Sequence, residues 1–218
     1  MVNVQMSSSD YLVESNRYGC SFIVAKLAKC SRYILPYPMV FLCKLHKYQF
    51  CIFCFRLKIN NYEFDFVCQI TPELETDGTP KKFFPQERYD NKKNLNLNKY
   101  GKGPFCKFSI DRKYSLKTGV YVILVDDLIE YAGECVDLFT RFGMGYGNIS
   151  PRNCFEGGQS TNCRINSNIL TAFKLKKSVQ SYFLETSDRS RIEHELIINL
   201  SPSWNKTSGK LAKIRSDY

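Results

Sequence analysis

Residues 119–133 read GVYVILVDDLIEYAG. Apolar, β-branched and aromatic residues on either side of a short polar turn predict a β-hairpin. A glycine lies near each outer end, and each glycine is close to a tyrosine, Tyr121 or Tyr131. The residues that follow, 136–142, have helix-like character. We expect the hairpin and this helix to form the floor of an active site that the rest of the C-terminal half completes.

Composition limits the class of protein. The chain has 218 residues, of which 44% are hydrophobic and 14% aromatic, enough for a packed core. Its formal net charge of +10 favours an anionic partner, nucleic acid first and an acidic membrane surface second. No apolar run approaches the ~20 residues of a membrane span, and Met1–Asp10 does not resemble a secretory signal. We therefore expect a cytoplasmic protein whose ten cysteines are mostly reduced and buried.

The N-terminal part is predicted to form an arm over residues 1–60, to which the sequence assigns no role. Two residues lie between Cys43 and His46, and two lie between Cys51 and Cys54, a spacing found in zinc sites. Only four residues separate the two pairs, and bulky apolar residues surround them. Buried thiols are therefore the favoured interpretation, and zinc is the alternative.

Residues 61–116 are predicted to be an extension made of a strand and a basic loop. Alternation of polar and apolar residues predicts a strand over 62–70, and a short strand is expected over 105–110. Between them, residues 91–99 form a Lys/Asn tract without periodicity. The tract is either a phosphate-contacting loop or a solvated linker.

The hairpin and its helix are followed by a long insert, residues 144–163, rich in glycine, asparagine and serine. A loop of this length in a compact domain is usually functional. Helical spacing follows over 165–177, a third strand over 179–184, and a final helix over 189–200 that Ser187 or Asp188 can cap. Residues 207–218 form a basic tail.

The polar candidates of this half occur in a fixed order, namely Tyr121, Tyr131, Arg141, Glu193 and Asn205. With Gly119-Val120-Tyr121 and Tyr131-Ala132-Gly133 as the two tripeptides, residues 117–206 resemble the GIY-YIG nuclease superfamily. The arginine of the first helix matches Arg141, and the glutamate of the later helix matches Glu193. The insert resembles the type II restriction endonuclease branch, less specifically.

The resemblance implies an α+β fold, with a small mixed or antiparallel three-stranded sheet flanked by helices. It also implies hydrolysis of DNA phosphodiesters with one divalent metal, Mg²⁺ or Mn²⁺. Glu193 would be the metal ligand, because Mg²⁺ prefers hard oxygen donors. Arg141 would present a planar fork of donors to phosphate. Tyr121 would be the general base, which requires that a nearby cation or metal lower its pKa from ~10.

Tyr131 and Asn205, the other two of the five residues in this order, would have supporting roles. Tyr131 would orient the water or the phosphate. Asn205 is expected to hold the C-terminal loop rather than to act in catalysis.

Several other side chains are candidates for contacts with double-stranded DNA. Basic residues would contact backbone phosphates, which adds affinity without specificity. Asn and Gln side chains of the insert could read base edges, since amides pair well with adenine. These candidates are Arg152, Arg164 and Lys174 for phosphates, His194 beside Glu193, and Gln159, Asn162, Tyr146, Asn148 and Asn153 for bases.

The hairpin must satisfy one geometric condition if both tyrosines serve one site. A simple two-residue turn at Asp126-Asp127 would place Tyr121 and Tyr131 on opposite faces of the sheet. We therefore predict either a three-residue loop or a β-bulge.

Three functions remain open. The first is a restriction-like, sequence-specific endonuclease, for which a homodimer would explain double-strand cuts most simply. The second is a repair or recombination nuclease that acts on branched DNA. The third is a DNA-binding module that keeps the fold without catalysis.

Overall fold

The computed structural model describes residues 56–206 in full and the backbone of residues 11–15, 21–25 and 49–51. The chain divides into two compact units, Met1–Met39 and Val40–Tyr218. In the first unit, β1 (Tyr11–Ser15) pairs antiparallel with β2 (Ser21–Ala25). The four candidate zinc ligands lie outside the residues whose side chains are described.

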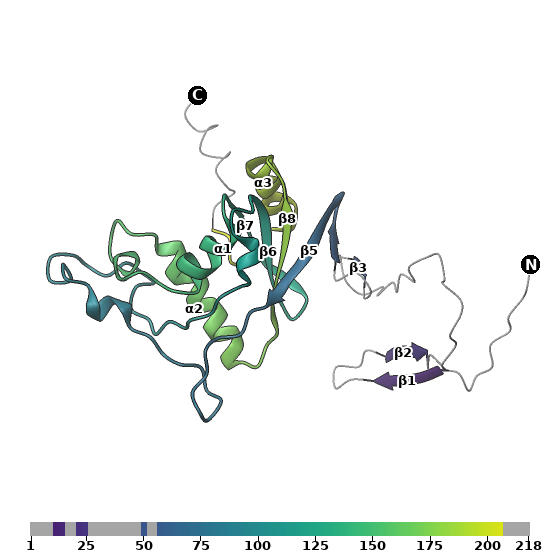
Figure 1. Ribbon diagram of the computed structural model, residues 1–218, viewed down its shortest axis with the longest axis horizontal. Coiled ribbons are helices and arrows are strands. Elements are labelled where there is room, and N and C mark those ends of the chain that lie inside the picture. The colour runs from purple at the N-terminus through teal and green to yellow at the C-terminus, as the bar shows by residue number, and fades with distance from the viewer. Residues whose placement is uncertain (1–10, 16–20, 26–48, 52–55, 207–218) are drawn as a thin grey trace, which may run out of the picture. The chain divides into compact units, whose positions relative to one another are not determined.

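The second unit is built on one antiparallel sheet (Figure 1). Its strand order is β3-β4-β5-β8-β6-β7. The strands span Gln49–Cys51 (β3), Arg56–Ile59 (β4), Tyr62–Gln69 (β5), Gly119–Val125 (β6), Leu128–Cys135 (β7) and Val179–Glu185 (β8).

The α+β class is confirmed, but a three-stranded sheet is wrong. The three strands predicted for the sheet are β6, β7 and β8. The strand predicted over 62–70 is confirmed as β5, and it extends the sheet because it pairs with the free edge of β8. β4 pairs antiparallel with β5 and so belongs to the same sheet. Its residues, 56–59, lie inside the range that was assigned to an arm. Residues 105–110 form no strand, and only an isolated bridge joins Phe83 to Phe105.

Helices form near all three predicted segments, but only the last has the predicted bounds, and both ends of the predicted insert, residues 144–163, are helical. α1 (Leu138–Thr140) continues directly into η3 (Arg141–Tyr146), α2 spans Ser160–Lys174 and α3 spans Arg189–Leu200, the predicted range. Short 3₁₀ turns are η1 (Pro85–Arg88), η2 (Arg112–Tyr114) and η4 (Pro151–Cys154). In the described part of the chain, no helix has the length and apolar character needed to cross a bilayer.

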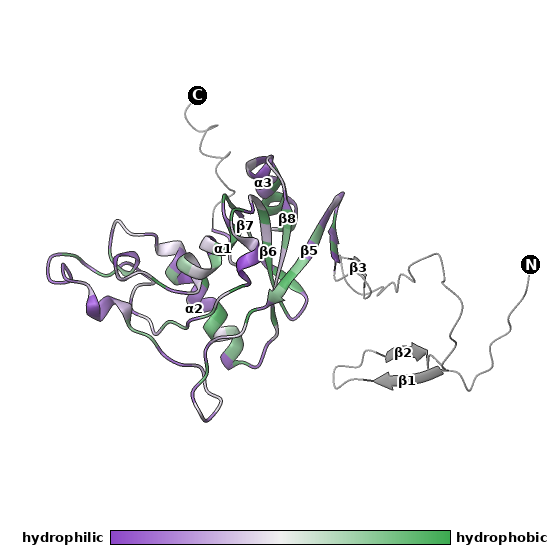
Figure 2. Cartoon of the chain, in the orientation of Figure 1, coloured by the Kyte–Doolittle hydropathy of each residue, from purple (hydrophilic) through white to green (hydrophobic). Residues whose placement is uncertain are grey.

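The sheet is covered on both faces. β6 is buried at all seven positions, since its odd and even residues contribute to two different cores. On one face, Tyr121, Ile123 and Tyr131 pack with residues of α2 and η3. On the other, Val120 and Val122 pack with residues of α3. Figure 2 shows hydrophobic residues along the central strands and hydrophilic residues on parts of α3.

The β6–β7 hairpin contains the predicted bulge. Asp126 and Asp127 form a two-residue turn, both with positive φ (47° and 67°), as a type I′ turn requires. The register then shifts, because Leu124 pairs with Ile129 whereas Ile123 pairs with Tyr131. Glu130 is the extra residue. The bulge places Tyr131 on the same face as Tyr121, so this part of the prediction is confirmed.

Candidate functional site

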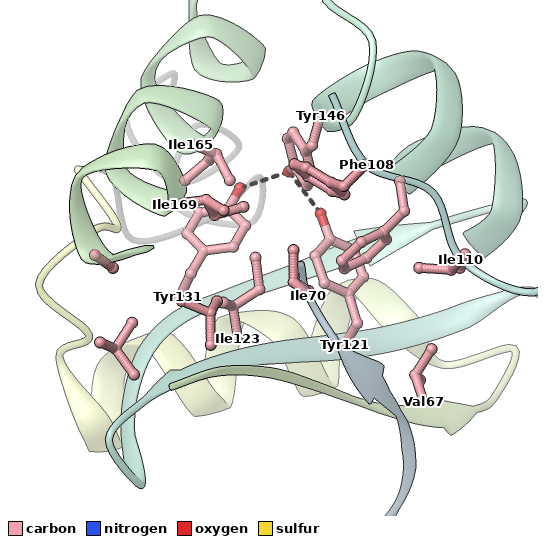
Figure 3. Packing of buried hydrophobic residues seen from close by; sticks show 14 of the residues in the cluster. Val67, Ile70, Phe108, Ile110, Tyr121, Ile123, Tyr131, Tyr146, Ile165 and Ile169 are labelled. Carbon is pink, nitrogen blue, oxygen red and sulfur yellow. Dashed lines mark hydrogen bonds between the residues drawn. The ribbon is translucent and has the colours of Figure 1, made fainter. Parts of the chain in front are cut away.

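Three tyrosine hydroxyls meet beneath the first helix. The hydroxyl of Tyr146 lies 2.7 Å from that of Tyr121 and 3.3 Å from that of Tyr131 (Figure 3). All three side chains are buried, with at most 8% of any of them exposed. Their rings pack at an angle to one another, with centroids 6.2 Å apart in each pair. We call Tyr121, Tyr131 and Tyr146 the tyrosine cluster.

Gly133 and Gly119 have separate structural reasons for lacking a side chain. A Cβ on Gly133 would lie 2.5 Å from the Tyr121 hydroxyl and 2.9 Å from the Tyr131 ring. A Cβ on Gly119 would lie 2.1 Å from the carbonyl oxygen of Leu184 on β8. Gly133 therefore leaves room for the tyrosine cluster, and Gly119 allows close pairing within the sheet.

A π-helical segment brings Arg141 and Tyr146 together. Asp137 caps the helix by accepting a hydrogen bond from the backbone N–H of Thr140, and the π-turns begin at Arg141. The Gly147 N–H donates to the Phe142 carbonyl, five residues back, at 2.6 Å. In this geometry residue i+5 lies above residue i. The Arg141 guanidinium accordingly stands 5.8 Å from the centroid of the Tyr146 ring.

The environment of the cluster favours neutral tyrosines. Burial raises the pKa of Tyr121 and of Tyr131 well above the ordinary value, and raises that of Tyr146. The positive charge of Arg141 opposes this effect at Tyr121 but does not outweigh burial. The direction is opposite to the one that a general-base role for Tyr121 requires.

Glu193 lies on α3, which packs on the other face of the sheet, near its β7 edge. Its negative charge nevertheless reaches the tyrosine cluster, where it helps to raise the pKa of Tyr131 and of Tyr146. Glu193 and the neighbouring His194 are both partly exposed.

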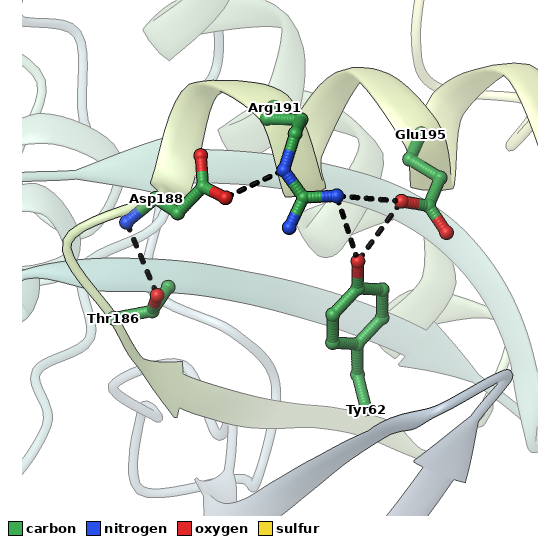
Figure 4. A network of polar contacts seen from close by, with 5 residues as sticks. All are labelled: Tyr62, Thr186, Asp188, Arg191 and Glu195. Carbon is green, nitrogen blue, oxygen red and sulfur yellow. Dashed lines mark hydrogen bonds and ion pairs between the residues drawn. The ribbon is translucent and has the colours of Figure 1, made fainter.

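Glu195, two residues further on, belongs to a different surface of α3. Its carboxylate accepts a hydrogen bond from the Tyr62 hydroxyl at 2.9 Å and pairs with Arg191 at 3.3 Å (Figure 4). Arg191 in turn pairs with Asp188 (Figure 4). This network ties α3 to β5 and confirms that Glu195 points away from Glu193.

Asn205 fastens the C-terminal loop to β7. Its side chain forms two hydrogen bonds with the backbone of Ala132, one donated and one accepted, each 2.9 Å long. The Trp204 N–H donates to the Glu130 carbonyl at 2.8 Å, at the bulge. The contact expected of Asn205, holding this loop, is confirmed.

Arg164 was expected at the surface but is only 8% exposed. Its guanidinium donates to the carbonyl of Trp204, so it supports the same loop from α2. Its charge also lowers the pKa of Tyr131 against the larger effect of burial. Arg164 therefore belongs to the interior of the site, and little of its side chain is accessible to a DNA phosphate.

Arg141 also lines an open cleft of about 310 Å³. The cleft runs between the end of β7, the first helix and the insert. Its polar lining includes three of the predicted amides, namely Asn153, Gln159 and Asn162. Asn162 donates to the Gln159 side chain at 3.0 Å and is itself buried, so Gln159 is the exposed member of the pair. Arg141 is thus shared by the cleft and the tyrosine cluster.

The other predicted contacts lie apart from this cleft. Arg152 is held within the insert by donating to the Glu156 carbonyl at 2.6 Å. Lys174 is exposed at the far end of α2. Asn148 borders a separate cavity of about 10 Å³, which holds one water at most. Tyr146, expected to read bases, is buried in the tyrosine cluster instead.

The donor set around Glu193 suits one kind of metal. No group of three or more potential ligands was found among His, Cys, Asp and Glu of the described residues. Mg²⁺ commonly binds through one or two carboxylates and keeps several waters, so a single half-exposed glutamate fits it. A structural zinc site, which needs four protein ligands, does not fit here.

Comparison with known proteins identified no relative of this chain. No protein-family model matches the chain, and no curated protein or solved structure matches it significantly.

Proposed function

We propose that the chain is a metal-dependent endonuclease that hydrolyses DNA phosphodiester bonds, as the resemblance to the GIY-YIG superfamily implies. One observation carries the proposal. Of the five residues selected by their order in the sequence, Tyr121, Tyr131 and Arg141 lie close together, and Asn205 and Glu193 each act on Tyr131 or its strand. Arg141 stacks on the tyrosine cluster, Glu193 acts on it electrostatically, and Asn205 fixes the strand that bears Tyr131.

Arg141 is the residue best placed to bind the reacting phosphate. It is half-buried, it lines the open cleft, and its plane of donors suits phosphate oxygens. A guanidinium placed where charge develops stabilises the transition state. We expect Arg141→Ala to lower the cleavage rate by about 10²–10³-fold, the usual cost of losing one such donor.

The tyrosine cluster acts as a neutral hydrogen-bonding unit in this proposal. Because burial raises the pKa of Tyr121, its hydroxyl stays protonated and serves in hydrogen bonding rather than removing a proton. The Tyr146 hydroxyl is hydrogen-bonded to the other two hydroxyls and so fixes their relative positions. Glu193 would hold Mg²⁺, which when bound supplies charge stabilisation and lowers the pKa of a bound water.

The test compares two glutamates of one helix. Wild type, Glu193→Gln and Glu195→Gln are incubated with unmethylated plasmid and phage DNA in Mg²⁺. We expect discrete fragments from wild type and from Glu195→Gln, because Glu195 serves the contacts with Tyr62 and Arg191. Glu193→Gln should cut at least 100-fold more slowly.

Three other outcomes discriminate among the alternatives. Cleavage of four-way junctions or flaps alone would favour the repair nuclease. Salt-sensitive binding without cleavage of any DNA would favour the binding module. Equal cutting by wild type and Glu193→Gln would contradict the role of Glu193.

A further inference from the structure

A second polar cluster lies beside the candidate site and outside the residues that the proposed function uses. The Lys206 ammonium donates to the hydroxyl of Tyr100 and stands 4.8 Å from the centroid of its ring. The Lys99 ammonium lies 5.8 Å from the same centroid. Both lysines are exposed and the tyrosine is half-buried. We call Lys99, Tyr100 and Lys206 the basic clamp.

The loop side of the basic clamp is anchored to the insert. The Tyr100 N–H donates to the side-chain oxygen of Asn98 at 2.9 Å. The Asn98 amide then donates to the carbonyl of Asn153 at 2.6 Å, and Asn153 lines the cleft beside Arg141. The end of the Lys/Asn tract is therefore tied to the wall of the cleft.

The other side of the basic clamp is anchored to β7. Lys206 directly follows Asn205, whose side chain is bonded twice to Ala132, the neighbour of Tyr131. Consecutive Cα atoms lie about 3.8 Å apart, so the chain cannot carry Lys206 far from this edge. The Lys99–Tyr100 segment and Lys206 are thus each attached to an element that contributes residues to the candidate site.

The two lysines of the clamp make no ion pair with a carboxylate of the described residues. The hydrogen bond from Lys206, with the charges of Lys206, Lys99 and Arg164, lowers the pKa of Tyr100. Positive charges held close together attract an anion.

We propose that Lys99, Tyr100 and Lys206 bind a backbone phosphate of the DNA strand that enters the candidate site, at a position flanking the reacting phosphate. This inference rests on the proposed function for its ligand. Two ammonium groups and a hydroxyl supply donors to phosphate without reading a base. The clamp would hold the strand on the Tyr131 side while Arg141 holds it from the cleft.

The experiment measures DNA binding rather than cleavage. A duplex of about 30 base pairs is titrated by fluorescence anisotropy without divalent metal, in the Glu193→Gln background, between about 50 and 200 mM salt. Each phosphate contact contributes about 0.9 to the slope of log K against log salt. Because the clamp holds one phosphate, we expect Lys99→Ala/Lys206→Ala to reduce this slope by about 0.9.

The matched control removes two other exposed lysines. Lys58→Ala/Lys176→Ala makes the same change in charge at two exposed positions that are not among the candidate DNA contacts. Its slope should change much less. Tyr100→Phe keeps both charges, so the slope should remain while affinity falls about 3- to 10-fold through one lost hydrogen bond.

The outcomes separate this inference from the proposed function. Equal slopes for the two double variants, or no change in either, would overturn the clamp, whether or not the wild type cuts DNA. A selective loss of slope in Lys99→Ala/Lys206→Ala supports the clamp, even if no variant cleaves any DNA.

Discussion

Tyr146 is the residue on which the tyrosine cluster depends, because its hydroxyl contacts both of the others. Tyr146→Phe keeps the ring that Arg141 covers and removes one oxygen. Leaving buried hydroxyls without their partner costs about 1–3 kcal/mol. We expect the free energy of unfolding, measured in urea, to fall by that amount.

Tyr114→Phe is the control for this substitution. The Tyr114 hydroxyl lies 3.4 Å from the Phe66 carbonyl and its side chain is half-exposed, so the loss should stay below about 0.5 kcal/mol. Equal effects in the two variants would show that the hydroxyl of Tyr146 adds nothing to the cluster.

The sequence identifies residues by type and order more readily than by contact. Tyr121, Tyr131 and Arg141 were selected from their positions in the chain, and they do lie together. Tyr146 was assigned to base reading because residues 144–163 were interpreted as a loop, and even in a continued α-helix it would point about 140° away from Arg141. Only the π-helical turns bring it above Arg141, and the glycines around it were the one available signal.

At the scale of the element, the hairpin and α3 could be predicted but the extent of the sheet could not. The need for two tyrosines on one face required a bulge or an odd loop, a local argument that the register confirms. The pairing of β5 with β8 joins segments more than a hundred residues apart. No local pattern specifies such a partner, because either strand presents equivalent backbone donors and acceptors to any edge.

The π-helical element provides a matched pair of glycines. A Cβ on Gly147 would lie 2.0 Å from the Phe108 carbonyl oxygen and 2.6 Å from that of Phe142, both backbone atoms. A Cβ on Gly143 would meet nothing within 4 Å. We expect Gly147→Ala to destabilise the protein by more than about 2 kcal/mol, because backbone must move.

Gly143→Ala should instead be neutral or stabilising by up to about 1 kcal/mol, since alanine restricts the unfolded chain. Thermal unfolding of both variants tests the pair. Similar melting temperatures for the two would mean that the tight approach of Gly147 to Phe108 is not required for the fold.

At the scale of the whole molecule, buried thiols should make stability depend on alkaline pH. Burial raises the pKa of Cys106 from 9.0 to about 12 and that of Cys135 to about 11. Between pH 9 and these values the folded protein keeps protons that the unfolded chain has lost. Stability is therefore fully present below about pH 9 and falls as pH rises, by about 1.4 kcal/mol per pH unit for each thiol.

A second effect has the opposite sign and must be separated from the first. The chain carries a net charge of +10, and deprotonation of lysines at high pH relieves this repulsion in the folded state. Comparing Cys106→Ala with wild type removes the shared contribution. The volume lost in Cys106→Ala lowers stability equally at every pH. Only the change of the stability difference with pH therefore measures the ionisation of the Cys106 thiol.

We expect the unfolding free energies of wild type and Cys106→Ala to differ by a constant below about pH 9. Above it the difference should shrink by about 1.4 kcal/mol per pH unit up to about pH 12, the pKa of Cys106 in the folded protein. Guanidinium denaturation at four or five pH values would measure both slopes. Parallel curves throughout would mean that Cys106 ionises alike in the folded and unfolded chains, which its 1% exposure and its position in the core argue against.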